Sequence, residues 1–377
     1  MLVARARETS TVITPLLDEI ERDCRLPQAA VDALVAAGVF KLCVPRVYGG
    51  AQANPATVLA TIEELATLDG SVGWCAMIGA TSGLMSVYLD DAIAREVYSP
   101  ADAITCGVFA PTGRAVPAPG GYTVTGRWAF ASGCQHSRWR MGGTIAGGDA
   151  PELLPSGAPD VRSVLFRADE TTVHETWDTS GLRGTGSHDL EVREVSVPRE
   201  RTFSLLTDTP KHDGYALPFF GVLASGIAAV GLGIARAALD TVVAIATTKK
   251  LPGGKKTLAS RELVQLEVAR AEARLRAARG LLFDALAEAI HVTGDPRHAV
   301  RTRAQVRLAA CHAATETAAV TAAAYELGGG GAVYRRSPLQ RQFRDAHVVT
   351  HHLMVSSTAL AMAGRVLLGV ETDTSTL

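Results

Sequence analysis

The chain lacks features that mark several common functional classes. Its six cysteines are scattered over 377 residues without a CxxC pair, and aromatic residues make up only 5% of the sequence. Isolated cysteines are typical of reduced cytoplasmic proteins and argue against a disulfide framework or a zinc site. The formal net charge is −1. A near-neutral chain gives no electrostatic reason to expect nucleic acid or an anionic membrane as a partner.

Long apolar segments are also scarce. The first ten residues contain no apolar core of a signal peptide. One stretch, 215–235, carries no charge and is long enough to span a bilayer. It is rich in Ala and Gly, has Pro218 near its start, and has no counterpart elsewhere in the chain. We therefore expect a bundle helix that is covered on all sides, and a cytoplasmic protein without a membrane partner.

What the sequence does contain is a change of hydrophobic period along the chain. Apolar residues recur at helical spacing, then alternate, then return to helical spacing. This pattern predicts an N-terminal helical domain (1–101), a β-domain (102–206) and a C-terminal four-helix bundle (207–377). The expected class is mainly α with a central antiparallel β-barrel or sandwich.

The predicted elements follow from the same pattern and from Gly, Pro and Asp at the breaks. N-terminal helices are expected at 9–23, 27–38, 54–65 and from 70 onward. Strands are expected at 104–108, 122–125, 127–132, 140–145, 163–167 and 190–197. Bundle helices are expected at 215–247, 257–293, 297–327 and 338–370. The helix that starts at 70 would present Trp74 and Ile78 on one face, which fits either a pocket wall or an ordinary core.

A short stretch of the β-domain, GRWAFASGCQHSRW (126–139), has the clearest functional pattern. Alternation predicts a strand with Trp128, Phe130 and Ser132 on one face, separated by a tight connection from the strand before it. The rings would form apolar walls for a flat aromatic cofactor, and the hydroxyl beside Gly133 would supply one directional hydrogen bond. The alternative is a β-hairpin with buried aromatic residues and a serine at its turn.

Four motifs, in order, give the sequence a family resemblance. They are LCVPRVYGG (42–50), DGSVGW (69–74), FASGCQH (130–136) and GLRGTGSH (181–188). Together with the order of helices and strands, they resemble the acyl-CoA dehydrogenase fold over nearly the whole chain. Within that fold, they resemble the flavin-dependent monooxygenases, the oxygenase components of two-component systems. The resemblance implies reduced flavin (FMN or FAD) as cofactor, O2 as co-substrate, a separate flavin reductase as partner, and no metal.

The last predicted helix separates the two branches of the fold. At the two positions where the dehydrogenases carry a carboxylate base, this chain has Leu353 and Leu223, and leucine cannot accept a proton. The resemblance instead implies that His352 faces the flavin, with His351 as the alternative. An imidazole can hydrogen-bond a flavin hydroperoxide or take a proton from a substrate. His347 and His351 have a metal-like spacing, but no third and fourth ligands accompany them.

The resemblance also implies roles for the pocket. Ser132 would bind flavin N5 beside Trp128, Phe130 and Gly133, and His352 and Ser132 would be the catalytic residues. Trp74, Ile78 and His351 would line the substrate pocket. A dry pocket would protect a C4a-hydroperoxide, which would hydroxylate a small aromatic or polyketide-like substrate, or oxidise an amine or a sulfur.

Other residues have less specific patterns. Arg183, Ser187 and His188 would border the pocket or only form a turn. The lysine-rich loop 249–256 stands where the dehydrogenases bind flavin phosphate with an arginine, and a solvated charged loop is the alternative. Gly329, followed by Arg335 and Arg336, resembles the region where a neighbouring subunit touches the cofactor, which implies a homotetramer.

Two other functions fit the same resemblance. One is an acyl-CoA dehydrogenase-like flavoenzyme with an atypical base, and the other is a flavin-free member of the fold that acts in binding or assembly. The sequence leaves open the substrate, the choice of FMN or FAD, and the identity of the reductase.

Overall fold

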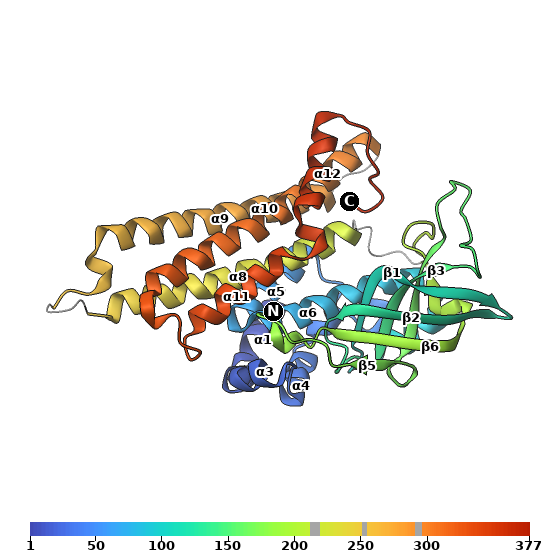
Figure 1. Cartoon of the computed structure of the whole chain (residues 1–377), viewed down its shortest axis with the longest axis horizontal. Coiled ribbons are helices and arrows are strands. Elements are labelled where there is room, and N and C mark those ends of the chain that lie inside the picture. The colour runs from blue at the N-terminus through green and yellow to red at the C-terminus, as the bar shows by residue number, and fades with distance from the viewer. Residues whose placement is uncertain (212–218, 251–254, 291–295) are drawn as a thin grey trace.

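The molecule is elongated, with helices along most of its length and a twisted β-sheet at one end (Figure 1). The computed structural model describes residues 1–211, 219–250, 255–290 and 296–377. The predicted order of a helical region, a β-region and a second helical region is confirmed.

Seven α-helices precede the sheet. They are α1 Leu2–Glu8, α2 Ser10–Ile13, α3 Leu17–Asp23, α4 Gln28–Ala36, α5 Pro55–Leu68, α6 Gly70–Ser82 and α7 Asp91–Tyr98. The predicted helix 9–23 is divided by a 3-10 turn at Thr14–Leu16, because Pro15 has no N–H to donate. Asp69 caps α6 by accepting two N–H groups of its first turn, and this cap fixes the helix that carries Trp74.

The described residues form one seven-stranded sheet in the order β5-β6-β2-β1-β3-β4-β7. The strands are β1 Thr105–Ala118, β2 Gly121–Ala131, β3 Trp139–Ala146, β4 Val161–Arg167, β5 Thr172–His174, β6 His188–Pro198 and β7 Thr202–Phe203. Five neighbouring pairs are antiparallel, as predicted, but β1 and β3 are parallel. The chain after β2 returns to the start of β1, where the N–H of Arg138 donates to Ile104 O, and β3 therefore runs beside β1 in the same direction.

Strand β2 joins two strands that the pattern predicts as separate. Its pairing with β6 is irregular at two places, one of them between Trp128 and Ala131. There Phe130 has a φ of +68°. This left-handed conformation leaves the Phe130 side chain 70% exposed, whereas Trp128 is 1% exposed. The prediction that Trp128, Phe130 and Ser132 share one face is therefore wrong.

In the described residues after the sheet there are five α-helices: α8 Phe219–Thr248, α9 Glu262–Ile290, α10 Pro296–Gly328, α11 Pro338–Thr350 and α12 Ser357–Leu368. The prediction of one helix over 338–370 is wrong, because the helix breaks after Thr350. His352 adopts an extended backbone in the break, and the Ser356 hydroxyl accepts the N–H of Ala359 to start a new helix. The break places His352 at the end of a helix instead of on its side.

The two helical regions share one hydrophobic core. Helix α8 lies at its centre and packs against α5 and α6 on one side and α10 on another. Among the described residues, only α8 is long and apolar enough to cross a membrane, and 89% of its most apolar stretch is buried inside the protein. Its burial agrees with the expected central helix of a bundle. The sheet has a second core around Trp128, Tyr122 and Phe166.

Candidate active site

A chain of hydrogen-bonded hydroxyl groups connects α6 to the loop before β6. The Trp74 Nε1–H donates to Ser132 Oγ at 2.9 Å. Ser132 Oγ and Ser187 Oγ are 2.6 Å apart, and Ser187 Oγ and Thr185 Oγ1 are 2.7 Å apart. Thr185 Oγ1 donates to Leu182 O at 2.7 Å. The four side chains are at most 6% exposed, so this hydroxyl chain (Trp74, Ser132, Ser187, Thr185) is a buried polar network.

The direction of the hydroxyl chain follows from its two ends. Each hydroxyl has one proton, and Thr185 gives its proton to Leu182 O. Ser187 must therefore donate to Thr185, and Ser132 must donate to Ser187. The indole N–H of Trp74 can only donate, and Ser132 accepts it. Ser132 has no proton left for a ligand, and its remaining lone pair makes it an acceptor only.

Sequence reasoning identified half of this network. It assigned Ser132 a binding role, placed Ser187 only at the border of the pocket or in a turn, and did not single out Thr185. The signal was present in GLRGTGSH, where two hydroxyl residues alternate with glycines (181–188). Ser187 lies 55 residues after its partner Ser132, so only the folded chain reveals the contact.

Two residues next to Ser132 have backbone conformations that suit a binding surface. Phe130 meets Trp177 edge-on, with ring centroids 6.1 Å apart. A left-handed phenylalanine costs about 1–3 kcal/mol, and an exposed ring gains little burial in return, which indicates a functional position. Gly133 has a φ of +74°, and a Cβ there would lie 2.9 Å from His136 Nε2. Glycine at 133 therefore lets the chain turn directly after Ser132.

Trp128 does not line a pocket, in contrast to its predicted role. Its Nε1–H donates to Gly143 O at 2.7 Å, and the ring fills the core of the sheet. A Cβ on Gly113 or Gly142 would lie 2.4 or 2.5 Å from the indole, so glycines make room for it. Ile78, one turn after Trp74, is partly buried and contacts both the helical core and the sheet core.

His352 is the histidine that meets the hydroxyl chain. Its ring lies beside Trp74, with centroids 5.6 Å apart and planes at 58°. Its Nδ1 accepts the N–H of Met354 at 3.1 Å, so Nδ1 carries no proton and the neutral ring is protonated at Nε2. His351, the alternative, ends α11 with an exposed side chain.

The surroundings of His352 keep it uncharged. Burial lowers its pKa to about 4, and the positive charge of Arg307 acts in the same direction. Arg307 is itself 2% exposed and donates to the carbonyl oxygens of Met354 and Thr376. At neutral pH, His352 is therefore a neutral hydrogen-bond donor through Nε2.

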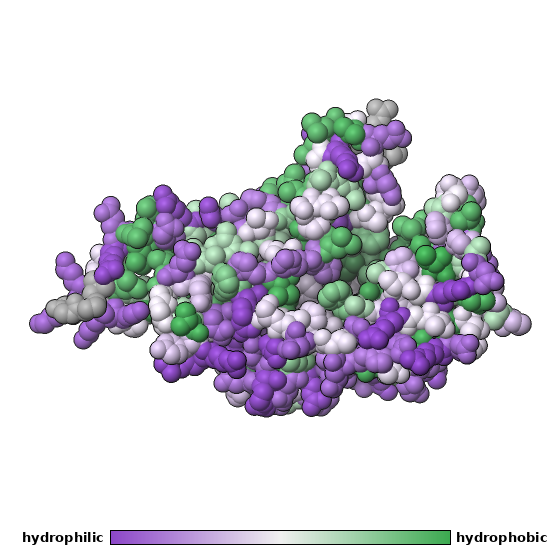
Figure 2. Space-filling view, viewed as in Figure 1, coloured by the Kyte–Doolittle hydropathy of each residue, from purple (hydrophilic) through white to green (hydrophobic). Residues whose placement is uncertain are grey.

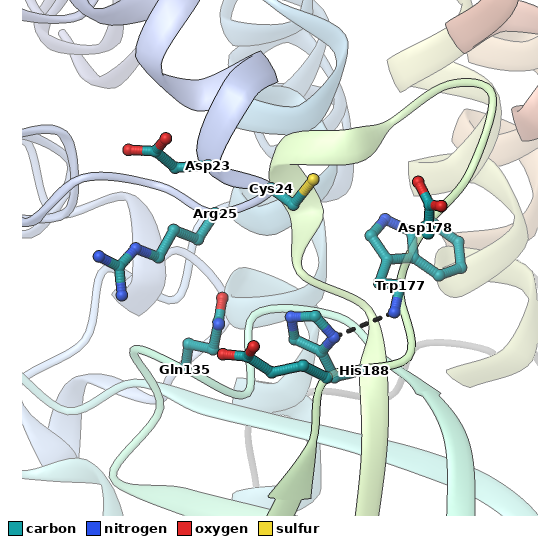
Figure 3. A pocket seen from close by; sticks show the side chains of 8 residues that line it. Asp23, Cys24, Arg25, Gln135, Trp177, Asp178 and His188 are labelled. Carbon is teal, nitrogen blue, oxygen red and sulfur yellow. Dashed lines mark hydrogen bonds between the residues drawn. The ribbon is translucent and has the colours of Figure 1, made fainter.

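A pocket of about 400 Å³ opens between the end of α3 and the loops at β6 (Figure 3). In it, His188 Nδ1 accepts the N–H groups of Thr176 and Trp177, both at 3.1 Å. Its lining side chains include both acids and bases: Asp23, Cys24, Arg25, Gln135, Glu175, Trp177, Asp178 and His188. Such a mixed lining does not suit an apolar aromatic ligand, although Trp177, which meets Phe130 edge-on, borders this pocket as well.

On the face drawn in Figure 2, hydrophobic side chains gather in a hollow between the C-terminal helices and the sheet.

The α10–α11 connection, with Gly329 and Arg335, lies at the opposite end of the bundle (Figure 1). Both residues are exposed, and a Cβ on Gly329 would have no atom of this chain within 4 Å. Within a single chain, Gly329 and Arg335 therefore do not lie at the site around Ser132. The lysine-rich loop 249–256 lies partly outside the described residues.

Comparisons with known proteins agree with this geometry. Residues 1–93 match the family model "Acyl-CoA dehydrogenase, N-terminal domain", and residues 225–357 match "Acyl-CoA dehydrogenase, C-terminal domain". An indole-3-acetate monooxygenase of Pseudomonas putida is 36% identical over 94% of this chain and 90% of its own. The oxygenase component of an FADH(2)-dependent resorcinol hydroxylase of Rhizobium sp. (strain MTP-10005) is 29% identical over 98% of this chain and 94% of its own.

A solved structure shows the same architecture. XiaF from Streptomyces sp., in complex with FADH2 and glycerol, superposes with a TM-score of 0.88 at 26% identity, covering 98% of this chain and 95% of that one. The relatives that align over nearly the full length are monooxygenases, which confirms the branch that the sequence motifs indicate. This chain belongs to the flavin-dependent monooxygenases that share the acyl-CoA dehydrogenase fold.

Proposed function

We propose that the protein is the oxygenase component of a two-component system. It takes reduced FMN or FAD from a separate flavin reductase and uses O2 to hydroxylate a small aromatic substrate. Two relatives support this proposal: one is an indole-3-acetate monooxygenase, and the other is the oxygenase component of an FADH(2)-dependent resorcinol hydroxylase. The flavin supplies the activation of O2 when bound, and the protein supplies placement and exclusion of water.

The observation that carries this proposal is the direction of the hydroxyl chain. A reduced isoalloxazine has an N–H at N5, whereas the oxidised ring has a bare nitrogen that only accepts. Ser132 presents only a lone pair to a ligand, and so it matches the reduced form. The exposed ring of Phe130 and the partly buried ring of Trp177 offer apolar contact for a flat ring. No metal is part of this proposal.

Trp74 and His352 form the other wall of the proposed site. The indole covers Ser132 and limits the access of water to it, while Ile78 continues the same helix face toward the sheet. His352, with its proton on Nε2, donates to an oxygen of the substrate or of activated O2. It is not the general base, because burial, and then the nearby positive charge of Arg307, lower its pKa and disfavour a second proton on the ring.

This assignment predicts that product formation per flavin oxidised is constant between about pH 6 and 8, because His352 is already neutral there. The His352→Ala variant should lose most of the product at every pH in this range, and His351→Ala, an exposed neighbour, should not. Product and hydrogen peroxide are quantified across the range with reduced flavin in excess. An inflection near the ordinary histidine pKa of about 6.5 that disappears in His352→Ala would show a base instead.

The substrate class is tested with isotopic oxygen. Purified protein, a flavin reductase, NADH and FMN or FAD are incubated with indole-3-acetate, indole or resorcinol under ¹⁸O₂. We expect one ¹⁸O atom per molecule of product for at least one of these rings, or for an amine or sulfide analogue. Reduction of bound flavin by an acyl-CoA under anaerobic conditions, without oxygen transfer, would support the dehydrogenase alternative. The sequence speaks against this alternative, because Leu353 and Leu223 stand at the two positions where the dehydrogenases carry a carboxylate base.

We further propose that the protein is a homotetramer in the cytoplasm. Helix α9 leaves Leu263, Leu266 and Leu281 more than 40% exposed, which a second copy would cover. Gly329 and Arg335 would then reach the cofactor of a neighbouring subunit. All six cysteines are free thiols, and five of them are buried, which suits a reducing compartment.

A further inference from the structure

Two buried carboxyl groups lie where α6, α11 and the loop before β6 meet. Asp69 caps α6, and Asp345 belongs to α11. Their residues are 8% and 2% exposed, and both line a small cavity of about 50 Å³. They are 276 positions apart in the sequence. Within the described part of the chain, neither forms a hydrogen bond or an ion pair with Phe130 or His352.

Asp345 holds the end of the hydroxyl chain. Its Oδ1 accepts the N–H of Leu182 at 2.6 Å, and the carbonyl oxygen of the same Leu182 accepts the proton of Thr185. The loop approaches α11 closely, since a Cβ on Gly181 would lie 2.6 Å from the carbonyl carbon of Arg344. The N–H of Leu182 is therefore held by Asp345, and its carbonyl oxygen is held by Thr185.

The same carboxyl group touches the start of α6. A Cβ on Gly70 would lie 3.0 Å from Asp345 Oδ2, so glycine is what allows this approach. One residue earlier, Asp69 uses Oδ1 for the first turn of α6 and places Oδ2 3.6 Å from Arg341 Nη1. The pair thus connects the helix of Trp74 with α11, which ends directly before His352.

The charges around the pair do not balance two carboxylates. Arg341 faces Asp69, and this guanidinium also donates to Leu17 O and lies 3.6 Å from Asp18. The charge of Arg344 favours the ionised form of Asp345, and the charge of Glu21 opposes it. Other charged side chains on the neighbouring elements pair with each other: Arg344 with Glu21, and Arg183 with Asp178. Burial raises the pKa of Asp345 to about 8, with the negative charge of Asp69 as the second cause, and burial raises the pKa of Asp69 as well. One proton on the pair removes the excess charge.

We propose that Asp345 and Asp69 are positioning residues of the oxygenase site: by tying the loop 181–187 to α6 and α11, they hold Ser132, Trp74 and His352 in one arrangement. The proposal rests on the proposed function, because the arrangement matters only if these three residues act together. Neither carboxyl group reacts with flavin or substrate. The proton that they hold stays on the protein throughout.

Two substitutions at Asp345 separate this role from simple packing. Asp345→Asn keeps an acceptor for the Leu182 N–H and carries no negative charge, as the protonated Asp345 carries none. Asp345→Ala leaves the Leu182 N–H buried without an acceptor. We expect Asp345→Asn to keep wild-type coupling of flavin oxidation to product, and Asp345→Ala to lower it about tenfold. Asp178→Asn, an exposed charge in the same loop, is the control and should behave as wild type.

Thermal unfolding gives a readout that needs neither flavin nor substrate. The folded protein keeps a proton on Asp345 that the unfolded chain loses near pH 4, so this contribution to stability is present below about pH 4 and is lost as the pH rises to about 8. Asparagine does not titrate. The Tm of Asp345→Asn minus the Tm of wild type should therefore increase between about pH 5 and 8 and then level off.

The two sets of results also separate this inference from the proposed function. If wild type couples oxygen to product but both Asp345 variants lose it equally, the pair does not position the site through its hydrogen bonds, and the inference is wrong. A Tm difference that does not change with pH would contradict the shared proton. If wild type itself transfers no oxygen but the Tm difference changes with pH as expected, the proposed function is wrong, and the proton on the carboxyl pair is still supported. Should Asp345→Ala not fold, the pH dependence of the Tm difference between Asp345→Asn and wild type still tests the proton on the pair.

Discussion

The Ser132→Ala variant is expected to release about ten times more of its reducing equivalents as hydrogen peroxide than wild type does. The substitution removes the acceptor of the Trp74 N–H and the donor to Ser187 at once, because both bonds meet at Ser132 Oγ. A buried indole N–H without an acceptor draws water into the site or turns the ring away from it. Peroxide and product are measured together during turnover with reduced flavin.

Ser137→Ala is the matched control for this prediction. Ser137 is in the same loop and is 4% exposed, and its hydroxyl donates to Gly133 O instead of joining the hydroxyl chain. It should lose some stability without changing the share of peroxide. Equal peroxide release from both variants would mean that the loop, and not the hydroxyl of Ser132, protects the site.

Gly181→Ala is expected to destabilise the fold by about 2–3 kcal/mol, and to lower coupling in the protein that remains folded. Its Cβ would meet the backbone carbon and oxygen of Arg344 at 2.6 Å, and helix α11 cannot yield there without moving Asp345. The free energy of unfolding is measured in urea at neutral pH. Gly280→Ala in α9 is the control, because no atom lies within 4 Å of its Cβ, and alanine should stabilise that helix by about 0.5–1 kcal/mol. A Gly181→Ala protein as stable as wild type would contradict the close packing of this loop.

The arrangement of helices and strands was accessible from the sequence because it depends on local periodicity and on breaks at Gly and Pro. The family motifs then indicated the branch, and the full-length relatives confirm it. The exceptions have identifiable causes. Phe130 turns out of the strand through a positive φ that alternation cannot show, and it therefore does not share a face with Trp128, which lies in the core of the sheet.

The site was only partly predictable because its geometry comes from distant contacts. The pattern of 338–370 is helical throughout, yet α11 ends at Thr350 and a new helix starts at Ser357, where the Ser356 hydroxyl accepts the N–H of Ala359. A serine before an apolar run is a capping signal that periodicity alone overlooks. The bond of Ser132 to Ser187 and the approach of Asp345 to Gly70 join segments far apart in the chain, and no local pattern encodes them.

The central claim, that this site holds reduced flavin in a form protected from water, is tested most directly without any substrate. The protein is mixed anaerobically with reduced FMN or FAD, oxygen is added in a stopped-flow instrument, and the appearance of oxidised flavin is followed together with peroxide release. We predict a lag before oxidised flavin and peroxide appear, shorter in Ser132→Ala and His352→Ala and unchanged in Ser137→Ala. Reoxidation as fast as that of free reduced flavin, with no difference between wild type and these variants, would contradict the account.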